Sequence, residues 1–64
     1  MKNYKVKEVI KLLEDDGWVM ITMRGSHRQF KHPTKAGKVT VNGHLNDTLS
    51  QFILNSIWKQ AGWK

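Results

Sequence analysis

The feature that most constrains the fold is a change in the spacing of apolar residues at Asp15-Asp16-Gly17. Before this break, from about Val6 to Glu14, apolar residues recur at the spacing of one helical face, which predicts an amphipathic helix. After it, Trp18 to Arg24 is an apolar, partly β-branched run bounded by glycines, which predicts a strand. A helix followed directly by a strand in a chain of 64 residues leaves room for one small domain.

The Gly25-Ser26 pair predicts a tight hairpin turn, so that His27 to Lys31 forms a second strand antiparallel to the first. Phe30 is the expected core anchor of this strand, and side-chain alternation then places Arg28 on the core side. The same alternation divides the first strand into Val19, Ile21 and Met23 on one face and Trp18, Met20, Thr22 and Arg24 on the other. The open face of the sheet is expected to carry Thr22, Arg24, His27, Gln29 and Lys31.

The rest of the chain predicts one more strand and one more helix. A loop from His32 to Gly37 leads to a strand at Lys38 to Val41, and the polar segment Asn42 to Thr48 is expected to be a connector. The second helix runs from about Ser50, its expected N-cap, to Ala61. Both helices have apolar stripes that need burial, so we expect an α+β domain over residues 1–64, with three antiparallel strands and two helices on one face of the sheet. This α-β-β-β-α order resembles the fold of double-stranded-RNA-binding domains.

Charge is distributed unevenly along the chain. Eleven Lys and Arg face five Asp and Glu, which gives a net charge of +6, and no acidic residue occurs between Asp16 and Asp47. Polyanions such as RNA, DNA or an acidic protein are natural partners of such a surface. The alternative is that the charge serves solubility alone.

Several classes of protein are disfavoured by what the chain lacks. Without cysteine it cannot form disulfides or thiolate metal sites, which fits a reducing cytoplasm. No apolar run approaches the roughly 20 residues that span a bilayer. The segment Met1 to Lys5 leads into a charged amphipathic stretch and does not resemble a signal peptide. We therefore expect a cytoplasmic protein that makes no contact with a membrane.

The residue best suited to chemistry is His27, because an imidazole can give or take a proton near neutral pH. The adjacent Ser26 points to the opposite face of the strand, so the two do not form a nucleophile and base pair. The histidines lie in basic surroundings without nearby acids, so we expect no metal and no cofactor. The alternative for His27 is an exposed residue beside a turn, and no partner is predicted for His32 or His44.

One ordered set of motifs resembles a known family. It consists of Gly17-Trp18, Gly25-Ser26-His27 and Gln29-Phe30-Lys31-His32-Pro33, and continues through Gly37 to Val41 and Asn55 to Gly62. This set is similar to the signature of the HicA family, small toxins of bacterial and archaeal toxin–antitoxin pairs, and it covers essentially the whole chain. Many members have a second histidine where this chain has Arg28, and a Val-Pro-His-Pro segment where it has Val41-Asn42-Gly43-His44.

The resemblance implies metal-independent cleavage of messenger RNA and neutralisation by a HicB-type antitoxin. The histidine that the family uses for catalysis falls on His27. The leading hypothesis is thus a ribonuclease toxin in which His27 is the general acid or base. The residues expected to contact RNA are Arg24, Ser26, Arg28, Gln29, Lys31 and Lys38, with Thr40 as a further candidate. The alternatives are a non-catalytic double-stranded-RNA-binding module and a protein whose basic face serves only to bind an acidic partner.

Overall fold

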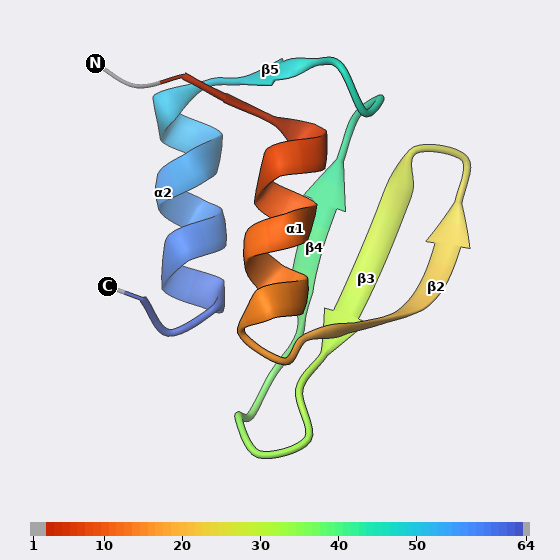
Figure 1. The fold of residues 1–64 in the computed structure, drawn as a ribbon, viewed down its shortest axis with the longest axis vertical. Coiled ribbons are helices and arrows are strands. Elements are labelled where there is room, and N and C mark those ends of the chain that lie inside the picture. The colour runs from red at the N-terminus through yellow and green to blue at the C-terminus, as the bar shows by residue number, and fades with distance from the viewer. Residues whose placement is uncertain (1–2, 64) are drawn as a thin grey trace.

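A computed structural model describes residues 3–63 and has the predicted order of two helices around a three-stranded antiparallel sheet (Figure 1). Met1, Lys2 and Lys64 lie outside the described residues, and so does part of the segment used to judge a signal peptide. None of the helices within residues 3–63 has the length and apolarity needed to cross a membrane. The elements are β1 (Tyr4–Lys5), α1 (Val6–Asp15), β2 (Val19–Arg24), β3 (His27–Lys31), β4 (Val39–Asn42), β5 (Thr48–Leu49) and α2 (Gln51–Gln60).

The two helices bury their apolar stripes against the same side of the sheet, as predicted. Leu13 of α1 and Ile57 of α2 belong to one buried cluster with Phe30 of β3, which is fully buried. Trp18 is 2% exposed and packs in this core. The core residues are Val6, Val9, Leu13, Trp18, Phe30, Val39, Val41, Leu49, Leu54, Ile57 and Ala61.

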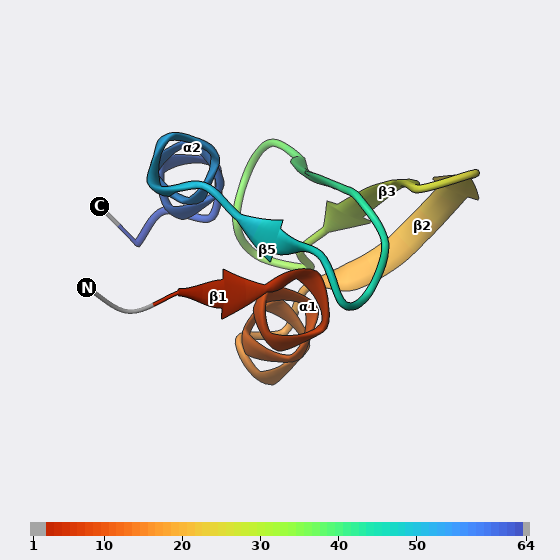
Figure 2. The ribbon, with the colours of Figure 1, turned by 90° about the horizontal axis from the view of Figure 1, so that it is seen from above.

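The short strands β1 and β5 were not predicted. Thr48, the first residue of β5, was assigned to the connector, and no strand was expected before the first helix. The two strands pair antiparallel, with Tyr4 opposite Leu49, and run along the end of the domain at which both helices begin (Figure 1 and Figure 2). The connector also supplies backbone acceptors to the first turn of α1: Val6 N–H donates to Asp47 O and Lys7 N–H to Leu45 O, both at 3.0 Å. These N–H groups have no partner inside the helix, so the tertiary contact satisfies them.

The predicted division of β2 into two faces is partly wrong. The pairing of β2 with β3 shifts between Met20 and Thr22, which leaves Ile21 as a bulge. Val19 therefore lies opposite Lys31 on the open face, and Met20 lies opposite Phe30 on the core side. The predicted alternation put each of these two residues on the other face. The physical reason is that one extra residue in a strand moves every side chain beyond it to the other face.

The β2–β3 hairpin projects beyond the layer of helices. In Figure 1 α1 lies over β4 and α2 lies beyond it, whereas β2 is at the far edge of the sheet, in the order β2-β3-β4. All six residues of β2 are consequently exposed, although four of them are large and apolar. One edge strand of the sheet thus keeps an apolar surface that the rest of the domain does not cover.

Candidate active site on the open face of the sheet

The turn between β2 and β3 positions the candidate catalytic residue. Gly25 has a φ of +57°, while no non-glycine residue among 3–63 has a positive φ, so the positive angle falls on the first central residue of the turn. This is the glycine position of a two-residue type II′ hairpin. The turn sets Arg24 directly opposite His27 in the antiparallel ladder.

His27 lies between two polar neighbours on the open face. Its Cα partners are Arg24 on β2 and Asn42 on β4, so all three side chains emerge on the same side of the sheet. The His27 side chain is exposed, and no hydrogen bond to its imidazole occurs within the part of the chain that the structure describes. An imidazole in this position is accessible to a substrate, and Arg24 is the cationic residue directly opposite it in the ladder.

Asn42 was missed by the sequence reasoning, which placed it in the connector. It is the last residue of β4, and Val39 and Val41 of the same strand are buried. Continuing that alternation by one residue would have put Asn42 on the open face beside His27.

The other predicted contact residues form a longer row on the same face. Gln29 is half-buried, with Thr22 and Thr40 as its Cα partners. Lys31 is exposed, but it lies four positions along the strand from His27, which corresponds to about 13 Å. Lys38 is exposed immediately before β4. Both lysines therefore lie beside the Phe30–Val39 pair, at the end of the strands away from His27.

Arg28 does not join this row. It lies on the core side, as predicted, but it is only 6% exposed, and its guanidinium donates to Gly43 O at 2.6 Å and to Ser26 O at 3.3 Å. Ser26 is half-buried, and its carbonyl also accepts the N–H of Gly43 at 3.1 Å. A guanidinium that is held by two backbone carbonyls and is nearly buried has little surface left for a phosphate, so the structure does not support the predicted RNA contact of Arg28. Its contacts instead fasten the start of β3 to the end of β4, next to His27.

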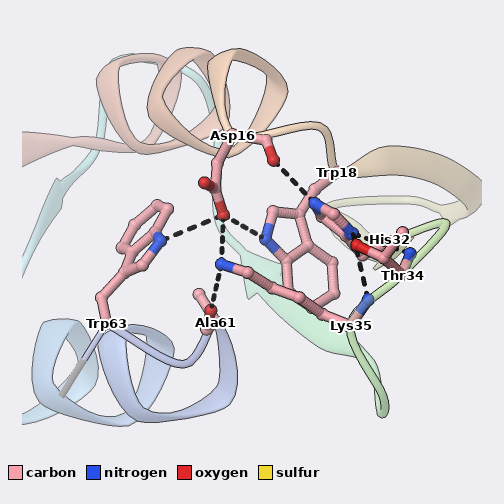
Figure 3. A network of polar contacts seen from close by, with 7 residues as sticks. All are labelled: Asp16, Trp18, His32, Thr34, Lys35, Ala61 and Trp63. Atoms are coloured by element: carbon pink, nitrogen blue, oxygen red, sulfur yellow. Dashed lines mark hydrogen bonds and ion pairs between the residues drawn. The ribbon is translucent and has the colours of Figure 1, made fainter.

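A second polar cluster lies at the other end of the sheet, around Asp16 (Figure 3). The backbone N–H groups of Thr34 and Lys35 both donate to His32 Nδ1 at 3.1 Å. Nδ1 is therefore unprotonated, so Nε2 carries the proton and donates it to Asp16 O at 2.7 Å. No partner was predicted for His32, and the structure supplies one: its ring ties the β3–β4 loop to the end of α1 and also packs edge-on against Trp18.

The Asp16 carboxylate connects the end of α1 with the β3–β4 loop and with Trp63. Its Oδ2 accepts from Lys35 Nζ at 2.7 Å and from the indole N–H groups of Trp18 and Trp63, each at 3.1 Å. Lys35 also donates to Ala61 O at 3.3 Å. The hydrogen bond from Lys35 is the main reason why the pKa of Asp16 is lowered, and the desolvation of the carboxylate opposes it. The cluster is structural, because none of its members reaches the open face around His27.

The lowered pKa of Asp16 predicts how stability depends on pH. A carboxyl group whose pKa is lower in the folded state stabilises the fold above its unfolded pKa, and this contribution is lost as pH falls through the folded pKa. Asp16→Asn should therefore unfold at lower urea concentration than the original chain at pH 7, and the gap should narrow below about pH 4. Urea midpoints of both proteins at pH 7, 5 and 3 measure this.

Asp15→Asn is the matched control for that experiment. Asp15 is 64% exposed and makes only a surface pair with Lys11 at 3.6 Å, so its replacement should change the midpoint very little at any of these pH values. A gap for Asp16→Asn that stayed the same from pH 7 to pH 3 would contradict the role given to the charged carboxylate.

No group of three His, Asp or Glu side chains able to hold a metal ion occurs among residues 3–63. A protein-family model described as the HicA toxin of bacterial toxin–antitoxin systems aligns with residues 6–63. The match includes both helices, the three strands of the sheet and the hairpin that carries His27. A search of curated proteins finds no match.

Proposed function

The chain belongs to the HicA family of toxins from bacterial toxin–antitoxin systems, and on that premise we propose that it is a ribonuclease that cleaves messenger RNA without a metal ion. Cleavage of messages in the cytoplasm would inhibit translation until an antitoxin neutralises the toxin. The observation that carries the proposal is the exposed imidazole of His27 beside Arg24, on a face with no acidic residue in any of its three strands.

In the proposed reaction the 2′-hydroxyl of RNA attacks the adjacent phosphorus, and the 5′-oxygen of the next nucleotide leaves. The imidazole of His27 either takes the proton of the attacking hydroxyl or gives one to the leaving oxygen, which is the work of a general base or acid. Arg24 lies opposite His27 in the ladder, where its guanidinium can stabilise the negative charge that develops on the phosphoryl oxygens. Arg28 acts as a positioning residue, because its hydrogen bonds to Ser26 O and Gly43 O hold the strand that carries His27 in place.

The remaining residues of the open face are proposed to bind the RNA chain. Lys31 and Lys38, which flank the Phe30–Val39 pair at the end of β3 and β4 away from His27, would contact phosphates on the same side of the reacting one, while Ser26 and Gln29 would form hydrogen bonds with sugar or base. The net charge of +6 supports this assignment, since a positive surface raises the local concentration of a polyanion.

The contribution of the lysines can be measured through salt. Lys31→Ala or Lys38→Ala should weaken binding to all RNA sequences alike and reduce the slope of log affinity against log salt by about one unit. Binding is best measured in a His27→Ala background, so that the RNA stays intact. Lys11→Ala, on the exposed side of α1, is the control and should leave the slope unchanged. An RNA affinity that does not change with salt would contradict the proposal that the basic residues of the open face bind phosphates.

The family also implies an antitoxin, and we propose an acidic partner of the HicB type that covers the open face. The positive field that attracts RNA would steer an acidic protein to the same surface. The uncovered strand β2 adds an apolar border, because Val19, Met20, Ile21 and Met23 are between 46% and 61% exposed. Protein interfaces combine such apolar contact with polar rims.

This proposal predicts competition between antitoxin and RNA. Adding antitoxin to a complex of RNA with His27→Ala protein should release the RNA, and Lys31→Glu should weaken the binding of both partners. Fluorescence anisotropy of labelled RNA follows the release. A stable ternary complex with unchanged RNA affinity would place the antitoxin elsewhere, such as on the groove of about 530 Å³ that Tyr4, Trp58 and Trp63 line.

The second candidate function is a non-catalytic RNA-binding module. The observation that favours it is that no neighbouring side chain orients the His27 imidazole by a hydrogen bond within residues 3–63. Incubation of the purified protein with RNA in EDTA separates the two candidates. Cutting that is lost in His27→Ala supports the ribonuclease, and binding without cutting supports the module.

A further inference from the structure

A groove of about 240 Å³ runs along the outer edge of β4, between that strand and α2. One wall is formed by Thr40 and Asn42, the open-face residues of β4. The other wall is a stripe of α2 made of Phe52, Ser56 and Gln60, which are spaced by four residues and so share one face of the helix. None of the residues that line the groove is charged.

Phe52 is the most unusual member of this groove. Its side chain is 84% exposed, more than any other large apolar residue among residues 3–63. Leu54 and Ile57 of the same helix are buried and attach α2 to the core, whereas the Phe52 ring lies outside the core. An exposed aromatic ring presents a face on which an unpaired base can stack, which is how many RNA-binding domains hold single strands.

Gln60 builds the wall of the groove rather than its binding surface. Its Oε1 accepts the N–H of Thr40 at 3.0 Å, and its Nε2 donates to Ser56 Oγ at 3.1 Å. These contacts hold α2 against the edge of β4, so they fix the distance between the two walls of the groove. The Asn42 side chain, in contrast, has no hydrogen-bond partner within the described part of the chain, so its amide keeps two donors and an acceptor for a ligand.

The groove is continuous with the proposed active site. Asn42 is the Cα partner of His27, and directly opposite side chains in an antiparallel pair have Cβ atoms about 4.5–5.5 Å apart. An RNA chain that crosses the sheet at His27 toward α2 would thus reach the groove with the next nucleotide. Because the lining has no cation, it suits a neutral base better than a phosphate.

We propose that this groove binds one unpaired nucleobase next to the phosphate that is cut, with Phe52 stacked on the face of the base and Asn42 hydrogen-bonded to its edge. The proposal rests on the proposed function, since it assumes that RNA lies across the open face. It assigns to α2 a part in substrate choice: stacking accepts any base, whereas the Asn42 amide distinguishes base edges.

The test compares variants of the His27→Ala protein for their affinity toward short single-stranded RNA at two salt concentrations. Phe52→Ala should weaken binding about 5- to 150-fold, the range measured for single stacked bases. The salt slope should stay unchanged, since stacking releases no counterions. Phe52→Trp should restore the affinity, and Asn42→Ala should reduce the differences among the four homopolymeric oligonucleotides. Leu45→Ala is the matched control, because Leu45 is 52% exposed and lies outside the groove.

Each outcome separates the groove from the function on which it rests. An RNA affinity that Phe52→Ala leaves unchanged, in a protein that does bind RNA, overturns the base site alone. If Phe52→Ala weakens antitoxin binding and not RNA binding, the groove is a protein docking surface and the proposal is also overturned. A protein that binds no RNA at any salt concentration overturns both the proposed function and the base site.

Discussion

Replacing His27 by alanine should abolish RNA cleavage and growth arrest while the domain remains folded. His27 is exposed on the open face, and its side chain makes no hydrogen bond within residues 3–63, so its loss removes no packing. Removal of a general acid or base typically lowers a rate by about 10²- to 10⁴-fold. Single-turnover cleavage of a labelled RNA by the purified protein measures this loss directly.

His44→Ala is the matched control for this variant. His44 is also an exposed histidine, but it lies in the segment after β4, and its described hydrogen bonds are made by its backbone. Its N–H donates to Asp47 Oδ2 and its carbonyl accepts the N–H of Asp47, both at 2.9 Å. It should cut RNA at the original rate. Circular dichroism and thermal unfolding should show both variants as stable as the parent. A folded His27→Ala protein that still cuts RNA or arrests growth would rule out His27 as the catalytic group.

Gly17→Ala should destabilise the domain strongly without touching the open face. Gly17 has a φ of +99°, and a Cβ at this position would lie 2.8 Å from His32 Nε2. The substitution therefore forces an unfavourable backbone angle on alanine and pushes the imidazole away from Asp16 O, which it now contacts at 2.7 Å. We expect a loss of about 1–3 kcal/mol in the free energy of unfolding.

The effect is large for so small a domain. A chain of this length has a total stability of about 3–10 kcal/mol, and each kcal/mol lowers the melting temperature by about 4–8 °C. Gly37→Ala is the control: Gly37 has a φ of +82°, but a Cβ added there would meet no atom within 4 Å. Equal losses of melting temperature in the two variants would show that crowding against His32 contributes nothing.

These two substitutions separate the two ends of the sheet. At the hairpin end, His27 and its ladder partners Arg24 and Asn42 face solvent, so substitutions of these three residues should change chemistry and spare stability. At the opposite end, the Asp16 cluster ties α1, the β3–β4 loop and the C-terminal residues together, so substitutions there should do the reverse. A variant of the Asp16 cluster that stays folded should still cut RNA at the original rate.

The sequence by itself determined the elements whose signals are local. The Ser50 hydroxyl accepts the N–H of Ile53 at 3.3 Å, as its position before the second apolar stripe predicts. The Gly25-Ser26 pair forms the hairpin turn, and alternation from Phe30 puts His27 on the open face. Each of these features depends on residues within about four positions of one another, where helix caps, turns and strand alternation act. The location of the candidate site could therefore be predicted, while its action on RNA stays a prediction.

The tertiary structure alone decided the features that join distant segments. The bulge at Ile21 arises from the pairing of β2 with β3, and Arg28 is buried because the chain returns to Gly43, 15 residues later, with a carbonyl for its guanidinium. The contact of Asp16 with Trp63 spans 47 residues. Polar side chains such as these have no strong local preference for burial. They become buried only where another protein group replaces water as their hydrogen-bond partner. Which group does so depends on how the helices pack on the sheet, and the spacing of residues within one segment does not contain that information.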